Sequence, residues 1–138
     1  PRPVIAACSG HAVALGTFLL CCCDYRIGVK GEFMLGANEM RTNMVIPTPI
    51  LELIKFRVSN AHKYRSVLGA EMYTLEDSIS AGLIDEVVDQ NSLMSAVEEK
   101  AKDLSTMGHP SYSMTKELFI AEPYSKIIEA MNELDKNV

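Results

Sequence analysis

Residues 3–16 read Pro-Val-Ile-Ala-Ala-Cys-Ser-Gly-His-Ala-Val-Ala-Leu-Gly. An apolar run at residues 4–8 is followed by a turn of small residues, and a second apolar run at residues 17–23 ends at Asp24. This order predicts a buried strand, a tight turn and the start of a buried helix. The first N–H groups of a helix have no partner within it, and the helix dipole is positive at that end. The turn therefore suits an anion or a developing oxyanion.

The composition is typical of a soluble, globular protein. The 138 residues suffice for one domain or slightly more, and they are 48% hydrophobic and 22% charged. Thirteen basic residues against eighteen acidic ones give a net charge of −5, which argues against a nucleic-acid partner. The apolar runs are shorter than the roughly 20 residues that cross a bilayer, so we expect no membrane partner.

The four cysteines, Cys8, Cys21, Cys22 and Cys23, include no Cys-x-x-Cys pair, and no histidine stands at metal-ligand spacing. We expect buried thiols in a reducing compartment, no metal site and a cytoplasmic location, with an organelle as the alternative. The chain begins at Pro1 and enters almost at once a strand that would need partners on both sides. We therefore expect it to be the later part of a longer protein.

The rest of the chain changes from short strands to helices. Further strands are expected at residues 25–29, 33–35 and 83–88. Between the second and third of these, residues 36–49 form a loop. The helices are expected at residues 17–23, 50–58, 60–68, 75–82, 91–108, 110–121 and 123–136.

Glu39 is the single carboxylate in the loop of residues 36–49, among several apolar side chains. A carboxylate removed from water is a competent proton shuttle near neutral pH. An oxyanion site beside one carboxylate suits proton transfer next to a thioester or another carbonyl, because N–H groups hold the enolate oxygen while the acid moves the proton. The residues alone also allow Glu39 to be an ordinary solvated loop residue and the glycine turn to be purely structural. Most loop glutamates are solvated, and many α/β proteins have a glycine turn before a helix.

Four segments occur in the order found in the enoyl-CoA hydratase/isomerase (crotonase) superfamily, and together they resemble it. They are residues 3–16, residues 23–27 (Cys-Asp-Tyr-Arg-Ile), residues 38–47 with Asn38-Glu39-Met40, Asn43 and Pro47, and residues 81–88 (Ala-Gly-Leu-Ile-Asp-Glu-Val-Val). The resemblance covers about the second half of a family member. It implies an α/β fold with a spiral of ββα turns, whose second part is residues 1–90, followed by a C-terminal helical oligomerisation region, residues 91–138.

The resemblance also implies the activity and the partners. Members of the family act on acyl-CoA thioesters, so coenzyme A is expected as part of the substrate and no separate cofactor is expected. A homotrimer or hexamer is expected from the family's helical region. The implied class is therefore an enzyme of the enoyl-CoA hydratase/isomerase type.

Residue by residue, the resemblance makes the backbone N–H of Leu15 one of two oxyanion-hole donors. The family has a run of three glycines where this chain has Ala14-Leu15-Gly16, so the Leu15 side chain is expected to crowd or reshape the pocket. Phe18 stands where hydratases carry a glutamate, and Glu39 matches the second glutamate. We expect Glu39 and Leu15 to be catalytic, and Ala14, Gly16 and Phe18 to bind substrate.

A single glutamate favours an isomerase-type reaction over standard hydration, because moving a double bond needs one base that takes a proton and returns it elsewhere. The second oxyanion donor of the family comes from a segment that would lie before Pro1. The alternative is therefore a catalytically inactive crotonase-like fragment or interaction module. A doubly wound nucleotide binder is disfavoured, since residues 10–16 do not supply Gly-x-Gly-x-x-Gly.

The remaining candidates have structural interpretations. His11 is expected to be a turn or wall residue, Asp24 to hydrogen-bond at the end of a helix or the start of a strand, and Arg26 to pair on the surface. Several large apolar residues are expected in the core: Met34, Met40, Met44, Phe56 and Phe119.

Overall fold

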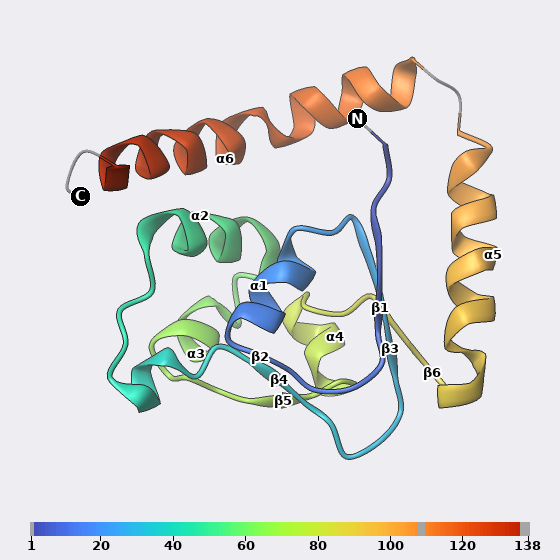
Figure 1. Cartoon of the computed structure of the whole chain (residues 1–138), viewed down its shortest axis with the longest axis horizontal. Helices are drawn as coiled ribbons and strands as arrows, with labels where there is room; N and C mark the ends of the chain where they lie inside the picture. Colours follow the sequence, from blue (N-terminus) through green and yellow to red (C-terminus); the bar gives the residue numbers. More distant parts are fainter. Residues whose placement is uncertain (1, 108–109, 136–138) are drawn as a thin grey trace.

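The computed structural model describes residues 2–107 and 110–135. Within these residues, short strands form two three-stranded sheets (Figure 1). The first sheet is parallel, in the order β1 (Ile5–Cys8), β3 (Tyr25–Val29), β6 (Glu86–Val88). The second sheet pairs β2 parallel with β4 and β4 antiparallel with β5; its strands are β2 (Ala12–Val13), β4 (Met34–Gly36) and β5 (Tyr73–Thr74).

The predicted strand, turn and helix at the start of the chain are confirmed, but the expected burial of the strand is wrong: only Cys8 of the four strand residues is buried, because the strand lies at the edge of its sheet. The strand is β1, and the helix is α1 (Leu15–Cys21), which begins two residues earlier than expected. Parallel strands need a crossover connection, and β2 with α1 provides the one that brings the chain from β1 back to β3. Gly28 on β3 leaves room for Leu75, which precedes α4, since a Cβ there would lie 2.7 Å from Leu75 Cδ2.

The other helical segments follow the expected order with two differences. The loop of residues 36–49 contains a short 3₁₀ helix, and a second one precedes the amphipathic helix. The segments are η1 (Glu39–Thr42), α2 (Thr48–Arg57), α3 (Lys63–Val67), α4 (Asp77–Ala81), η2 (Gln90–Ser92), α5 (Leu93–Ser105) and α6 (Ser111–Asp135). The ends expected at residues 108 and 136 lie outside the described residues.

The expected break between two terminal helices is wrong, because α6 runs through Pro123 without interruption. A proline inside a helix removes one backbone hydrogen bond and crowds the preceding turn. Pro123 is half-buried, and with Leu53 and Phe56 of α2 it lines a cleft between the two helices. Packing along α2 offsets the local cost, as tertiary contacts commonly do for helices. In Figure 1, α6 crosses the molecule above α2, and α5 stands beside β1 and β3.

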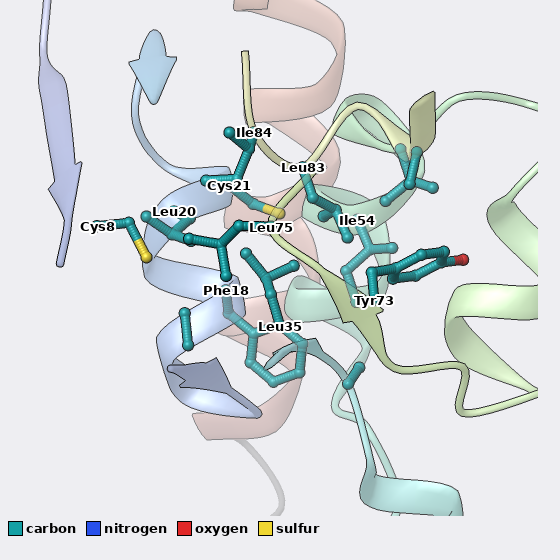
Figure 2. Packing of buried hydrophobic residues seen from close by; sticks show 14 of the residues in the cluster. Cys8, Phe18, Leu20, Cys21, Leu35, Ile54, Tyr73, Leu75, Leu83 and Ile84 are labelled. Carbon is teal, nitrogen blue, oxygen red and sulfur yellow. The ribbon is translucent and has the colours of Figure 1, made fainter. Parts of the chain in front are cut away.

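The main core lies between α1, the second sheet and α2, as Figure 2 shows. Its side chains come from elements far apart in the sequence: Phe18, Leu20 and Cys21 from α1, Leu35 from β4, Ile54 from α2, Tyr73 from β5, and Leu75, Leu83 and Ile84 around α4. The complete burial expected for the apolar helix is wrong on one side. Leu15 and Leu19 are 64% and 59% exposed, because no element among the described residues covers that stripe.

The large apolar residues expected in the core are mostly exposed. Met34, Met40, Met44 and Phe119 are 36%, 39%, 51% and 69% exposed, so the prediction is wrong for these four. Phe56 is half-buried and lies against Phe119, with 5.7 Å between ring centroids. In the part of the chain that the structure describes, no helix combines the length and the apolar character that crossing a bilayer requires.

Candidate active site

The site is built where the turn before α1 meets β4. The Ala14 N–H donates to the Gly36 carbonyl over 2.9 Å, and the helix begins with the bond from the Phe18 N–H to the Ala14 carbonyl. Leu15 and Gly16 are the first two residues of α1, so their N–H groups have no helical carbonyl to bond. The N–H assigned to Leu15 by resemblance therefore stands in the first turn of the helix.

Ala14 has φ 51° and ψ −116°, a backbone conformation that costs an alanine free energy. Gly16 has ordinary helical geometry, and a Cβ there would make only a 3.5 Å contact with the Ala12 Cβ. The position that favours glycine is thus Ala14. The Leu15 side chain is 64% exposed, so most of it lies in solvent and not in the packed interior.

Glu39 is the first residue of η1 and is only 6% exposed. Its backbone carbonyl accepts the Met44 N–H at 2.9 Å and the Thr42 hydroxyl at 3.1 Å, which fixes the main chain. Its carboxylate oxygen Oε2 is buried and has no hydrogen-bond partner among the described residues. A buried polar atom without a partner is costly, and such atoms mark sites where a ligand or a reacting group completes the bonding.

Phe18 and the segment that leads to Glu39 share one buried cluster. Phe18 is 7% exposed and belongs to the same cluster as Leu35 and Ala37, the latter two residues before Glu39. In Figure 2 the Phe18 ring lies beside Leu35. Phe18, assigned by resemblance to the position of a hydratase glutamate, thus packs as a buried apolar side chain between α1 and β4.

His11 and Asp24 have the structural roles expected for them. The His11 Nδ1 accepts the Met34 N–H at 3.0 Å, and its ring meets the Phe33 ring edge-on at 5.4 Å. The Asp24 Oδ2 accepts the Val4 N–H at 2.7 Å and the Lys116 ammonium at 2.6 Å. These bonds connect the start of the chain to α6.

The surface pair expected for Arg26 is wrong, because this guanidinium is buried. Arg26 is 4% exposed and donates two side-chain bonds to Asp85, from Nε to Oδ2 and from Nη2 to Oδ1, each 2.8 Å. A third bond runs from Nη1 to the Gly82 carbonyl. Burial of the arginine follows from its place on β3, the central strand of the first sheet.

The cysteines are all reduced, and their burial differs from the expectation at two positions. Cys8 and Cys21 are buried, Cys23 is partly buried and Cys22 is exposed. Burial raises the pKa of Cys8, and it raises the pKa of Cys21 to about 11, since the interior disfavours the thiolate. Among residues 2–107 and 110–135, no cluster of three His, Cys, Asp or Glu side chains could hold a metal ion.

Thr17 lies at the candidate site, and the sequence did not single it out. Its hydroxyl bonds both to the Ala12 carbonyl and to the Gly36 N–H, at the junction of the turn and β4. A threonine inside an apolar helical run has no sequence signal for this position, because the partner strand lies about 20 residues later.

The model of the family described as "Enoyl-CoA hydratase/isomerase" matches residues 1–138. The chain belongs to this family. Two solved structures share its fold closely. An enoyl-CoA hydratase/isomerase family protein from Pseudomonas syringae is 36% identical with a TM-score of 0.94, over 96% of this chain and 58% of that one. A Mycobacterium tuberculosis protein, named an enoyl-CoA isomerase with one structure and a probable enoyl-CoA hydratase with another, is 30% identical with a TM-score of 0.93, over 100% of this chain and 61% of that one.

Curated relatives in the family carry different reaction names. (E)-benzylidenesuccinyl-CoA hydratase from Thauera aromatica is 24% identical over 116 residues, which are 84% of this chain and 45% of the relative. The peroxisomal enoyl-CoA delta isomerase 1 of Arabidopsis thaliana is 28% identical over 86 residues, 62% of this chain and 36% of the relative. The chain thus spans less than half the length of these relatives, and its α/β architecture is that of the crotonase fold.

Proposed function

We propose that the protein carrying this chain processes acyl-CoA thioesters through an enolate, with Glu39 as acid and base and the Leu15 N–H as one oxyanion donor. The observation that carries the proposal is the buried Oε2 of Glu39, which has no protein partner among the described residues. Family membership supplies the acyl-CoA class of substrate.

The proposed reaction needs a base and an oxyanion donor at the same site. Glu39 takes a proton from the carbon next to the thioester carbonyl, the electrons move onto the carbonyl oxygen, and an N–H group holds the resulting oxyanion. Preorganised N–H donors stabilise such charge strongly where water is excluded. The Leu15 N–H, which lies in the first turn of α1 and has no helical carbonyl to bond, supports this arrangement. The bond between Ala14 and Gly36 supports it as well, because Gly36 lies three residues before Glu39.

Phe18 supports an isomerase-type reaction. Addition of water to a double bond requires a water molecule that is positioned and deprotonated, for which hydratases of the family use two carboxylates. The buried ring of Phe18 offers neither a proton acceptor nor a hydrogen bond to water. One carboxylate is enough to take a proton from one carbon and return it to another.

The proposal includes the binding surface and the assembly. Ala14, Gly16 and Phe18 line the acyl part of the site, and coenzyme A enters as part of the substrate with no resident cofactor. A homotrimer or hexamer is proposed through the terminal helices. Exposed apolar side chains along α6 support this: Met114, Leu118, Phe119, Tyr124, Ile128, Met131 and Leu134.

A second candidate is a crotonase-like interaction module without activity. The alanine held at positive φ in the turn and the phenylalanine at position 18 favour it, since both depart from the glycine run and the glutamate of hydratases. Such a module would keep the fold and the terminal helices but would not bind acyl-CoA.

The test compares Glu39→Gln with wild type in the protein at its full natural length, with 3-enoyl-CoA and 2-enoyl-CoA as substrates. Glutamine keeps the size of the side chain and removes the acid, so kcat is expected to fall at least about 100-fold. Glu32→Gln is the matched control, because Glu32 is exposed in the turn between β3 and β4.

Calorimetric titration with a saturated acyl-CoA separates the two candidates. Binding by wild type and by Glu39→Gln supports the enzyme, since the variant loses only the proton transfer. A fall in kcat smaller than 100-fold would contradict the role of Glu39. Absence of binding by wild type would contradict the enzyme and favour the interaction module.

A further inference from the structure

Thr17 joins the turn before α1 to the strand that leads to Glu39. Its side chain is buried, with 2% of the residue exposed. Its hydroxyl donates to the Ala12 carbonyl over 2.6 Å and accepts the Gly36 N–H over 3.0 Å. We propose that Thr17 is a positioning residue, which sets the first turn of α1 relative to Glu39. This inference rests on the proposed function, because it concerns the geometry of that same site.

Gly36, which donates its N–H to the Thr17 hydroxyl, is held firmly in place. Both polar groups of Gly36 are bonded, the N–H to Thr17 and the carbonyl to the Ala14 N–H. Its φ is +153°, and a Cβ there would lie 2.7 Å from the Glu71 carbonyl oxygen, so the position has no room for another residue. A shift of Gly36 would therefore carry over to Glu39, which follows three residues later.

On the other side of this hydrogen bond, the turn before α1 is strained. Ala14 has a φ of 51°, which an alanine keeps only where the surrounding structure holds it. The Ala14 N–H and the Thr17 hydroxyl both hold this turn to Gly36, and Thr17 also ties it back to Ala12. Leu15, whose N–H is the proposed oxyanion donor, lies between these two attachment points.

A purely structural threonine and a positioning threonine predict different kinetics. Thr17→Val keeps the shape of the side chain and removes the oxygen, so the Ala12 carbonyl and the Gly36 N–H lose their partner. Thr17→Ser keeps the oxygen and removes one methyl group. If Thr17 positions the site, valine lowers kcat roughly 10- to 100-fold with KM nearly unchanged, because small misplacements are costly in catalysis. Serine then stays within about threefold of wild type.

The assay uses the protein at its full natural length, with the enoyl-CoA that wild type turns over, at a temperature where melting curves show every variant folded. Amide hydrogen exchange at Gly36 is the readout that does not depend on activity, and it is expected to accelerate in Thr17→Val and not in Thr17→Ser. If valine prevents folding, Thr17→Cys replaces it, since a thiol is a weaker donor and acceptor and predicts an intermediate kcat.

The outcomes are distinct. Wild-type kcat in Thr17→Val, or equal losses in the valine and serine variants, would overturn the positioning role. A change in KM with kcat unchanged would also overturn the positioning role. Failure of the proposed function appears differently, as absence of acyl-CoA binding by wild type itself.

Discussion

The strand-rich part of the chain, residues 2–88, and the helix α6 differ in which side chains they bury and which they expose. In the first, polar and charged groups such as Thr17, Arg26 and Glu39 are buried, at 2%, 4% and 6% exposure. In α6, large apolar side chains face solvent, and Leu118 is 79% exposed. Buried polar groups need partners at fixed positions, whereas exposed apolar groups favour association. The proposed chemistry therefore fits the first region, and the proposed assembly surface fits the second.

The contact between the two regions is partly polar. The Lys116 ammonium of α6 donates to the Asp24 carboxylate and to the Arg2 carbonyl, over 2.6 Å and 2.8 Å. From α2, Arg57 donates to the carbonyls of Cys21 and Cys23 at the end of α1. Helix α2 therefore contacts both α1 and α6.

The largest effect is expected from Asp85→Ala in the strand-rich part. The change leaves the buried Arg26 guanidinium without its carboxylate, which is expected to lower the free energy of unfolding by about 3 kcal/mol. Urea unfolding measures it. The control is Asp89→Ala, which breaks the exposed pair with Lys30 and is expected to cost less than about 1 kcal/mol. Equal losses in the two variants would contradict the distinction between buried and exposed charge.

A smaller loss of stability is expected at alkaline pH, where the Cys21 thiol ionises. Burial raises its pKa from 9.0 to about 11, so the folded protein holds the proton more tightly than the unfolded chain. The corresponding stability is fully present below pH 9 and is lost as the pH rises through 11, a change of about 2 to 3 kcal/mol. Urea unfolding from pH 8 to 11 is expected to show a steeper fall in wild type than in Cys21→Ala.

Part of that slope remains in the variant, because the pKa values of Cys8, Cys23 and Tyr25 are also raised, in each case mainly by burial. Identical slopes in wild type and Cys21→Ala would show that Cys21 does not titrate as a buried thiol.

The smallest effect is expected on the solvent-exposed side of α6. Leu118→Gln is expected to change the free energy of unfolding by less than about 0.5 kcal/mol, since the side chain is already in solvent. Ile120→Gln, on the half-buried side that faces α2, is the matched control and is expected to cost about 1 to 2 kcal/mol. Sedimentation velocity gives a second readout, because weaker self-association of Leu118→Gln is expected if this side is the assembly surface.

Much of the first region could be predicted from local patterns. The apolar run, small-residue turn and second apolar run led to β1 and α1, and the isolated carboxylate of the following loop proved to be buried at Glu39. The two-residue strands β2 and β5 escaped prediction, because pairs such as Ala12–Val13 carry no periodic signal. Arg26 was misplaced on the surface because nothing local indicates that its strand is central.

The second region was harder to predict. A proline normally ends a helix, so α6 was expected as two helices, whereas α6 continues through Pro123 and packs along α2. Apolar residues on a helix are usually interpreted as core, yet Phe119 is 69% exposed. Exposure depends on which neighbours are present, and a sequence does not state these.

The sequence by itself determined the order of motifs, because hydrophobic periodicity and glycine turns act over a few residues. The crotonase-type architecture and the candidate acid Glu39 followed from the resemblance of these motifs, taken in order, to the family. Only the tertiary structure decided that a buried oxygen of Glu39 has no partner among the described residues and that Thr17 ties the turn to Gly36. These properties arise from hydrogen bonds and burial between segments about 20 residues or more apart, and local patterns carry no information about such distances.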